Sequence, residues 1–362
     1  MAATGLARGN QGGGADPQLA FRAVTAALRR QDAVRAGSVL LFLTGHFARD
    51  PIPAIHAAAR AAQTTQIAGC TAVGVLTDED WVIDTPAAAA LVFAHETDLM
   101  GPLPALGARV DDWLLALAAP NSASRDWLTM PGRRVGALSG DGTGRGPFPV
   151  WSAGKLLESG RLDLQVPQSR CRVTISTGLT PLSSLLGVTE VRAYDLLQVS
   201  HRPALSALVA QALPHLEAGQ PFPWHRLLLA RADDEPRLAL ASGEYELLPV
   251  LGVNPNRSLI VGGKLLKGDR IFSVLREPQS ARQELDVRLA TGRTDTPPHY
   301  GMLFNCAGRG PAFFDGRDAD WDSVRRAFPR MPLIGFYGNG EIAPIGGRNR
   351  LLQYASVCAL IG

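Results

Sequence analysis

Two glycine-rich segments near the C-terminal end of the chain carry charged residues that could bind a small molecule. In "CAGRGP" Arg309 stands between glycines, and in "GFYGNGEIAP" Glu341 follows three glycines. A guanidinium binds a carboxylate through two parallel hydrogen bonds, and a carboxylate forms a charged hydrogen bond with an amine. The pair would therefore suit a zwitterion. The alternatives are an internal salt bridge of Arg309, with Glu341 as a candidate partner, and a capping role for Glu341 in its own turn.

The glycines themselves need an explanation. Three of them stand beside two aromatic residues in 335–341, directly after the apolar run "MPLI". Glycine without a side chain allows another group to approach the backbone closely. In open α/β sheets, ligands bind in the crevice beyond the carboxyl ends of the strands. The sequence therefore predicts a glycine-lined pocket at this loop.

The cysteines Cys70 and Cys306 raise the possibility of thiol chemistry. Each stands beside small residues, at a similar place after or within an apolar run. A nucleophilic thiol needs a neighbouring base and an electropositive setting, and the seven histidines form no motif with either thiol. The sequence favours packing roles for both, and a cysteine-dependent enzyme acting on a small substrate is the alternative.

Other kinds of chemistry have little support. The loop "GDGTGRG" at 140–146 is followed by "PFPVW", which cannot begin the helix that a phosphate-binding loop requires. No pattern of metal ligands or serine-hydrolase residues is present. The 36 basic and 33 acidic residues leave a net charge of +3, in scattered pairs that do not favour nucleic-acid binding. The sequence predicts no metal, no cofactor and no catalytic residue.

The elements that would position these residues alternate between helices and strands. Helical periodicity or caps predict helices in 17–36, 51–63, 202–216, 280–292 and 319–329. Apolar runs predict strands at 37–45, 65–77 and 300–306 and before Gly335, and a strand with helix as the rival at 87–94. The first 17 residues are glycine-rich and are predicted to be disordered. No apolar stretch is long enough to cross a bilayer, so the protein is expected to be soluble and cytoplasmic.

Two segments repeat one plan. "VLLFLTG" leads through a helix to "IAGCTAVGVL", and "GMLFNCAGRG" leads through a helix to "LIGFYGNGEI". The sequence is thus consistent with an internal pseudo-two-fold repeat, whose glycine-rich ends would face one another. Strand–helix–strand is the commonest α/β unit, so a chance likeness is the alternative. The fold class predicted is α/β (mixed α+β), with two sheet-containing domains and helices packed on them.

The C-terminal block "FNCAGRGPAFF", followed by "IGFYGNGEIAPIGGRNRLLQYASV", resembles the C-terminal FIST domain (F-box and intracellular signal transduction). Upstream, "VLLFLTG" with "IAGCTAVGVL" is similar to the N-terminal FIST domain. The resemblance divides the chain into a disordered N-terminus at 1–17, a FIST N-like domain at 18–200 and a FIST C-like domain at 201–362. Outside the FIST region no signalling output domain is visible. One departure is Val75, which stands near a place where the family often has a glutamate.

The resemblance implies a sensory protein that binds a small ligand, with an amino acid or related zwitterion as the expected class. It also implies a signalling protein as a further partner. From the charge pattern and the short apolar stretches, no nucleic acid and no membrane insertion are expected. A protein-interaction scaffold without a ligand is another alternative. The predicted ligand-binding residues are Cys70, Thr71, Cys306, Arg309, Gly310, Phe336, Asn339, Glu341 and Asn349.

Overall fold

The structure is a computed structural model that describes residues 2–94, 107–166, 171–215, 222–292 and 296–362. It divides into two compact units, one formed by Met1–Thr177 with Leu285–Gly362 and the other by Gly178–Glu284. We call them the three-sheet unit and the barrel unit. No helix in the described ranges is both long and apolar enough to span a membrane.

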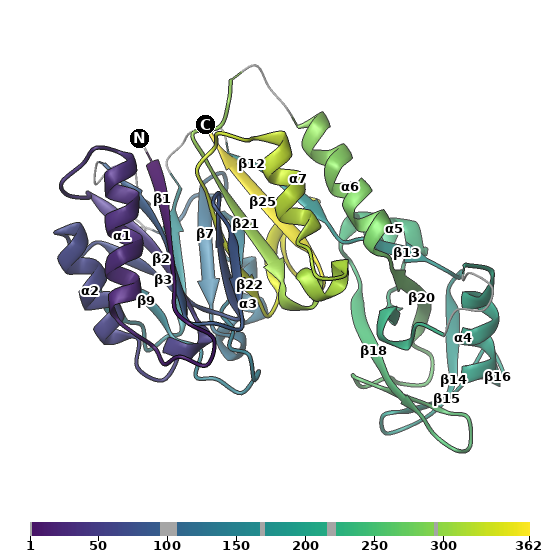
Figure 1. The fold of residues 1–362 in the computed structure, drawn as a ribbon. Coiled ribbons are helices and arrows are strands. Elements are labelled where there is room, and N and C mark those ends of the chain that lie inside the picture. The colour runs from purple at the N-terminus through teal and green to yellow at the C-terminus, as the bar shows by residue number, and fades with distance from the viewer. Residues whose placement is uncertain (1, 95–106, 167–170, 216–221, 293–295) are drawn as a thin grey trace. The chain divides into compact units, whose positions relative to one another are not determined.

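Helices and strands alternate through most of the chain, which confirms the predicted mixed α/β class (Figure 1). The α-helices are α1 (Gln18–Arg30), α2 (Ile52–Ala62), α3 (Arg125–Thr129), α4 (Ala204–Ala212), α5 (Pro236–Ser242), α6 (Pro278–Thr291) and α7 (Ala319–Ala327). Two short 3-10 turns follow strands that matter for the site: η1 (Gly45–Phe47) and η6 (Ala307–Arg309).

The strands of the three-sheet unit come from both ends of the sequence. They are β1 (Ala2–Arg8), β2 (Ser38–Thr44), β3 (Ile67–Ala72), β4 (Gly74–Thr77), β5 (Trp81–Ile83), β6 (Ala87–Phe93), β7 (Trp113–Ala118), β8 (Arg133–Leu138), β9 (Val150–Ser152), β10 (Lys155–Leu156), β11 (Arg161–Gln165), β12 (Cys171–Ser176), β21 (Tyr300–Cys306), β22 (Leu333–Gly338), β23 (Glu341–Ile345), β24 (Arg348–Leu352) and β25 (Ser356–Ile361).

These strands form three sheets that share one connectivity. The first sheet has the order β1-β6-β2-β3-β9-β10, the second β11-β7-β8-β23-β24 and the third β12-β25-β21-β22-β4-β5. Each contains one parallel pair: β2 with β3, β7 with β8, and β21 with β22. We call these the first, second and third parallel pairs. In each pair, an antiparallel strand flanks either side, so the three pairs have matching surroundings.

The sheets also exchange strands in a closed cycle. After β3 the chain enters the third sheet as β4, after β22 it enters the second sheet as β23, and after β8 it enters the first sheet as β9. The three strand ends are joined by backbone hydrogen bonds: Val73 N–H donates to the Tyr337 carbonyl at 3.0 Å, Gly140 to Thr71 at 3.0 Å and Asn339 to Leu138 at 3.2 Å. The carboxyl ends of β3, β8 and β22 therefore meet. The predicted two-fold repeat remains a prediction.

The core of this unit lies between the sheets. Phe42, Leu117 and Phe304, one from each parallel pair, belong to a single buried cluster. The opposite faces are covered by helices: α1 and α2 pack on the first sheet, α3 on the second and α7 on the third (Figure 1). Successive strand residues point to opposite faces, and each parallel strand is buried on both of them. This explains the continuous apolar runs in the sequence.

A glycine in each parallel pair allows the two strands to approach. A Cβ at Gly335 would lie 1.7 Å from the Leu303 carbonyl oxygen, and one at Gly69 would lie 1.7 Å from that of Leu41. At Gly136 the distance would be 1.9 Å, to the Ala116 oxygen. Gly335 was expected to make room for a ligand. The structure corrects this interpretation, because the neighbouring strand fills the space.

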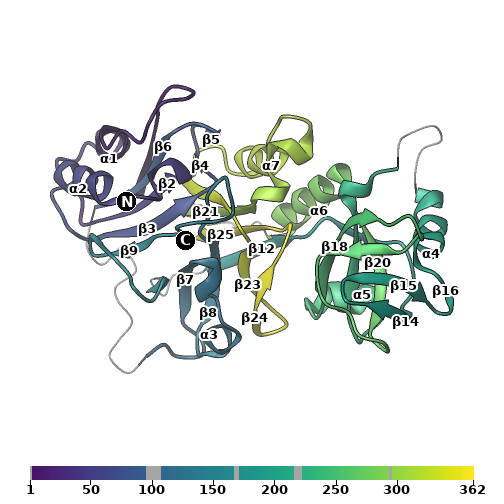
Figure 2. The same ribbon diagram turned by 90° about the horizontal axis from the view of Figure 1, so that it is seen from below.

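The barrel unit contains β13 (Leu179–Pro181), β14 (Leu186–Arg192), β15 (Asp195–Val199), β16 (Arg202–Pro203), β17 (Leu227–Arg231), β18 (Glu246–Val253), β19 (Leu259–Val261) and β20 (Arg270–Arg276). The order β20-β14-β15-β19-β18-β17 closes because β17 also pairs with β20. Figure 2 shows these strands curling around one another, with α4 and α5 beside them.

The N-terminal segment corrects one prediction. Ala2–Arg8 is not disordered: it forms β1, which pairs antiparallel with β6 along its whole length. Its glycine is a packing residue, because a Cβ at Gly5 would lie 2.1 Å from the Ala23 carbonyl oxygen in α1. A glycine-rich composition suggested disorder, whereas the pairing partner lies some eighty residues away and leaves no local signal.

The compact units also differ from the predicted division near residue 200. The last strands of the chain return to the sheets of the first half, where β25 pairs with β12 and β23 with β8. As a result the barrel unit interrupts the three-sheet unit instead of following it. At 87–94 the strand prediction is confirmed by β6, and its helical rival is wrong.

Candidate functional site

The candidate site lies at the carboxyl end of the third parallel pair. There Cys306 is opposite Gly338 in register, so the segments that leave the two strands start side by side. The first of these forms η6 and places Arg309, and the second turns into β23 and places Glu341. Parallel strands bring their loops to one edge of a sheet. This is how residues 32 positions apart come to one region.

Arg309 is fully buried and forms an internal ion pair. Its Nε and Nη2 groups donate to the two carboxylate oxygens of Asp320, at 2.7 and 3.0 Å. Its Nη1 and Nη2 groups also donate to the carbonyl and hydroxyl oxygens of Ser176, at 2.9 and 2.8 Å. The internal salt bridge that the sequence left open is therefore present, with Asp320 as the partner instead of Glu341.

The N-terminus of α7 supplies a second carboxyl group. Asp318 caps the helix by accepting from the Trp321 N–H at 2.9 Å, and the Tyr337 hydroxyl donates to its carboxylate. Burial, and then the nearby charge of Asp320, raise the pKa of Asp318 to about 7. Burial raises the pKa of Tyr337 well above its usual value. Near neutral pH the Asp318 carboxyl thus exchanges between its two protonation states.

Glu341 is the most unusual residue of the site. Its side chain is 0% exposed, and Oε2 accepts from the Ala355 N–H at 3.3 Å. Within the described residues Oε1 has no hydrogen-bond partner. Burial raises the pKa of Glu341 well above its usual range, while the charge of Arg309 acts in the opposite direction. A buried polar atom without a partner is rare in native proteins and needs an explanation.

The other two strand crossings show what packing alone requires at this position. Glu341 pairs with Ala137, the residue after Gly136 in β8. The matching positions are Val75, opposite Phe336, and Val150, opposite Cys70. Both valines are buried. An apolar side chain therefore fills this position twice, and the carboxyl group of Glu341 is not needed for the connectivity.

A polar network continues along the third parallel pair. Asn305, opposite Tyr337 in register, accepts through Oδ1 from the Ser356 hydroxyl at 2.7 Å. In the part of the chain that the structure describes, its Nδ2 group has no partner. Asn305, Ser356, Ser176, Asp318 and Asp320 were not predicted. The "DADWD" sequence at the start of α7 is the signal of a helix cap, whereas the serines reach the site only through strand pairing.

The predicted site residues are only partly brought together. Cys306, Arg309, Gly310 and Glu341 lie at the end of the third pair, and a Cβ at Gly310 would contact the Tyr337 ring at 3.4 Å. Asn339 lies in the adjoining turn, where its Nδ2 donates to the Ser139 carbonyl at 3.2 Å.

The remaining predicted residues have other surroundings. Phe336 packs edge-on against Phe42 and Phe304 in the core, and Cys70 belongs to the same cluster. Thr71 is buried at the end of the first parallel pair. The Asn349 amide donates to the Leu128 and Gly132 carbonyls and accepts from the Arg134 N–H. Asn349 therefore holds the connection from α3 to β8.

The surroundings of the Cys70 thiol do not favour nucleophilic chemistry. Burial raises the pKa of the Cys70 thiol well above its usual value, which disfavours the reactive thiolate. The glycine-rich loop at 140–146 is also occupied by its own side chain, since the Asp141 carboxylate accepts from the Gly144 and Gly146 N–H groups at 2.6 and 3.1 Å. Among the described residues, no group of three metal-ligating side chains is present.

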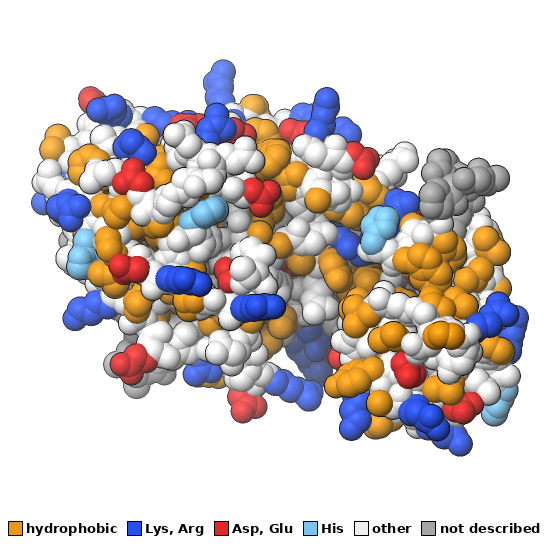
Figure 3. Space-filling view, turned by 60° about the horizontal axis from the view of Figure 1, so that its bottom comes forward, with side chains coloured by type: hydrophobic (Ala, Val, Ile, Leu, Met, Phe, Trp, Pro, Cys, Tyr) orange, Lys and Arg blue, Asp and Glu red, His pale blue; other side chains and the backbone are white. Residues whose placement is uncertain are grey.

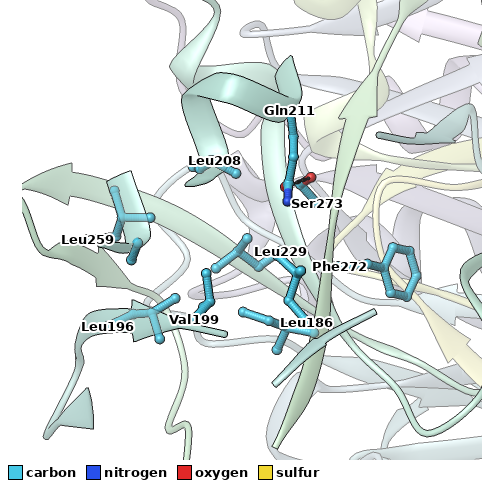
Figure 4. Close-up of a pocket in the computed structure, with 11 residues that line it drawn as sticks. Leu186, Leu196, Val199, Leu208, Gln211, Leu229, Leu259, Phe272 and Ser273 are labelled. Atoms are coloured by element: carbon cyan, nitrogen blue, oxygen red, sulfur yellow. Dashed lines mark hydrogen bonds between the residues drawn. The ribbon is translucent and has the colours of Figure 1, made fainter. Parts of the chain in front are cut away.

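A separate pocket lies in the barrel unit (Figure 4). Leu196, Val199 and Leu259 line it together with α4, and the Ser273 hydroxyl donates to Gln211 at 2.8 Å. Its volume is about 10 Å³, which is the lower limit for a single water molecule. An amino acid does not fit there, so this pocket does not replace the site at the third parallel pair.

Comparison with known proteins shows that part of the chain is similar to one protein family. The chain is 28% identical over 238 residues to uncharacterized proteins of Mycobacterium tuberculosis and Mycobacterium bovis, which covers 64% of this chain and 61% of those proteins. It is 31% identical over 116 residues to F-box only protein 22 of Homo sapiens, covering 29% of each. Residues 207–344 match the model of the FIST C domain. The part of the chain that is similar to the FIST C domain begins in the barrel unit and ends at the candidate site.

Proposed function

We propose that this protein binds a small ligand at the end of the third parallel pair and acts in sensing or signal transduction. The observation that carries the proposal is Glu341, whose fully buried carboxyl group has one oxygen unpartnered among the described residues. The matching positions hold Val75 and Val150. A buried ionisable group is unfavourable unless something pairs with it. A ligand that donates a hydrogen bond to Oε1 would supply that partner.

The FIST C domain supports the same reading, because this family is generally associated with signal transduction and sensing. The match to residues 207–344 includes Arg309 and Glu341. A signalling protein as a further partner, and a cytoplasmic location, are parts of the proposal.

A thermal-shift screen of the purified chain with amino acids, amines and organic acids tests the proposal. A ligand present at about 100 times its Kd stabilises the folded state by about 2.7 kcal/mol, which raises the melting temperature measurably. The shift should disappear in Glu341→Gln and persist in Glu79→Gln, a control in which an exposed carboxylate is changed. The absence of any shift across the panel would contradict the proposal.

A role as a protein-interaction scaffold is the second candidate. Figure 3 shows apolar side chains on the surface of the barrel unit. Four leucines among the described residues of this unit are more than half exposed: Leu213 at 57%, Leu238 at 64%, Leu251 at 65% and Leu266 at 56%. Exposed apolar surface is a feature of interaction sites. A screen without hits, together with protein binding that is lost in Leu251→Ser, would favour the scaffold.

A further inference from the structure

The buried charges of the site do not balance. The groups at the end of the third parallel pair include one guanidinium, Arg309, and three carboxyl groups, Asp318, Asp320 and Glu341, all of them buried. The ion pair between Arg309 and Asp320 is bidentate, so these two charges neutralise each other. Asp318 and Glu341 then have no cation of their own among the groups that act on them. Each must take up a proton or a cation to be buried without a large penalty.

Arg309 is not available to bind a ligand carboxylate, because it already binds groups of the protein. Its Nε, Nη1 and Nη2 groups all donate within the protein, to Asp320 and Ser176. A carboxylate that displaced Asp320 would leave that side chain buried as an uncompensated anion. Such a loss is strongly unfavourable. The part of a zwitterion that carries negative charge therefore has no prepared partner at Arg309.

An ammonium group would supply the hydrogen-bond donor and the positive charge that are missing beside Glu341. Oε1 needs a donor, and the ionised carboxylate needs a neighbouring positive charge. A charged N–H···O bond provides both and is about twice as strong as a neutral one. We propose that the ligand of this site is a small organic cation, an amine without a carboxylate, whose ammonium group donates to Glu341. This inference rests on the proposed function.

The ligand must reach a side chain that is fully enclosed, and the connector from β24 to β25 is the segment it would displace. Ala355 in this connector donates its N–H to Glu341. The preceding Tyr354 has a φ of 56°, which is uncommon for a bulky residue. A Cβ at Gly308, an exposed residue of η6, would lie 2.8 Å from the Tyr354 ring. The connector thus lies between the turn at η6 and Glu341.

The exchange of a proton for a cation gives the binding a definite pH dependence. The groups whose charges act on Glu341 are Arg309 from η6, which favours ionisation, and Asp320 from α7, which opposes it; the Ala355 N–H also favours ionisation. Binding of the ammonium ion releases the Glu341 proton to solvent, and no bond to the ligand is formed or broken. Raising the pH reduces the cost of this release, so the affinity for the amine should rise.

Calorimetry with matched probes tests the inference. Three amino acids are compared with the amines they would yield on losing the carboxylate: alanine with ethylamine, valine with isobutylamine, and phenylalanine with phenethylamine. For the best-fitting side chain, the amine should bind at least about tenfold more tightly than its amino acid. The binding heat should depend on the ionisation enthalpy of the buffer, and affinity should be higher at about pH 7.5 than at about pH 5.5.

The outcomes separate this inference from the proposed function. Amino acids that bind as tightly as their amines would overturn the inference while leaving ligand binding intact. No binding by either set would overturn both. In Glu341→Gln, amine binding and the buffer-dependent heat should be lost, and in Glu79→Gln they should remain. If Glu341→Gln does not fold, a binding heat independent of buffer in the unmodified chain overturns the inference by itself.

Discussion

The first and third parallel pairs have the same frame and different ends. In both, a glycine of the second strand lies against a leucine carbonyl of the first, with a Cβ distance of 1.7 Å. In both, a 3-10 turn follows the first strand. The turn after β2 buries Phe47, whereas the turn after β21 buries Arg309. The residue six positions after the glycine is Val75 in one case and Glu341 in the other.

The difference shows which residues the frame requires. The turn after β2 buries an apolar side chain where the turn after β21 buries Arg309, so buried charge is not a condition for this connectivity. Buried ions are unfavourable unless they are paired, and replacing them by apolar groups is often neutral or stabilising. Packing alone therefore does not explain the polar residues at the end of the third pair, and this favours a role in binding a small ligand.

The largest expected effect tests the shared part of the frame. In Gly335→Ala and Gly69→Ala, the new Cβ would overlap the carbonyl oxygen of the neighbouring strand. Because a backbone atom cannot yield as a side-chain end does, each variant should lose about 4 kcal/mol or more of unfolding free energy. Chemical denaturation measures this. Gly142→Ala is the control, since nothing lies within 4 Å of its Cβ position. If only one of the two variants lost stability, the first and third parallel pairs would not share the same strand packing.

The ion pair of the third pair comes next. Arg309→Met leaves Asp320 buried without its partner and should lower the unfolding free energy by about 3–5 kcal/mol. Arg133→Met removes a partner from the exposed pair with Asp111 and should change stability little. The double variant Arg309→Met/Asp320→Asn should be more stable than Arg309→Met alone. Equal losses in the buried and the exposed variant would contradict the structure.

The carboxyl group of Asp318 should make stability depend on pH. Because the folded pKa is raised from 3.8 to about 7, its favourable contribution is complete in acid and is lost as the pH rises through about 7. Asp318→Asn retains a residue type that caps helices and removes the titration. The difference in unfolding free energy between the two proteins should change by a few kcal/mol from about pH 4 to about pH 8. Parallel pH profiles would refute the assignment.

The smallest change in stability is expected for Glu341, the position at which the ends of the first and third parallel pairs differ most. Glu341→Val places at this position the residue that occupies the two matching ones. The variant removes the buried carboxyl group and leaves the Ala355 N–H without its acceptor, so the net change in stability should stay within about 1 kcal/mol. Denaturation at neutral pH measures it. A loss above about 3 kcal/mol would show that Glu341 is structural and would weaken the case for a ligand.

The elements near the site were largely predictable. The apolar runs predicted β2, β3, β21 and β22 in the right places. Strands that are buried on both faces are nearly continuous apolar runs, which are easy to recognise in a sequence. Asp318 could be read as a helix cap. The closure of the barrel through β17 and β20 was not predictable, since ring closure leaves no mark on either strand.

The partners within the site were not predictable in the same way. Ser176 lies 133 residues from Arg309 and reaches it only because β12 pairs with β25, which pairs with β21. The role of Gly335 was misread for a related reason: a glycine shows that a close neighbour exists, and its identity depends on the pairing register. Asn349 and Phe336 were also predicted at the site. Phe336 belongs to the buried core, and Asn349 lies in β24, where its amide bonds to the segment between α3 and β8.

By itself, the sequence determined the apolar parallel strands, the glycines where backbones meet, and the charged residues that leave the strand ends. These follow from local periodicity and from the absence of a side chain. The tertiary structure decided the cyclic exchange between three sheets, the pairing of Arg309 with Asp320 and the isolation of Glu341. They depend on long-range strand pairing, whose hydrogen bonds join backbone groups that are alike in every residue and so leave no trace in the residue types.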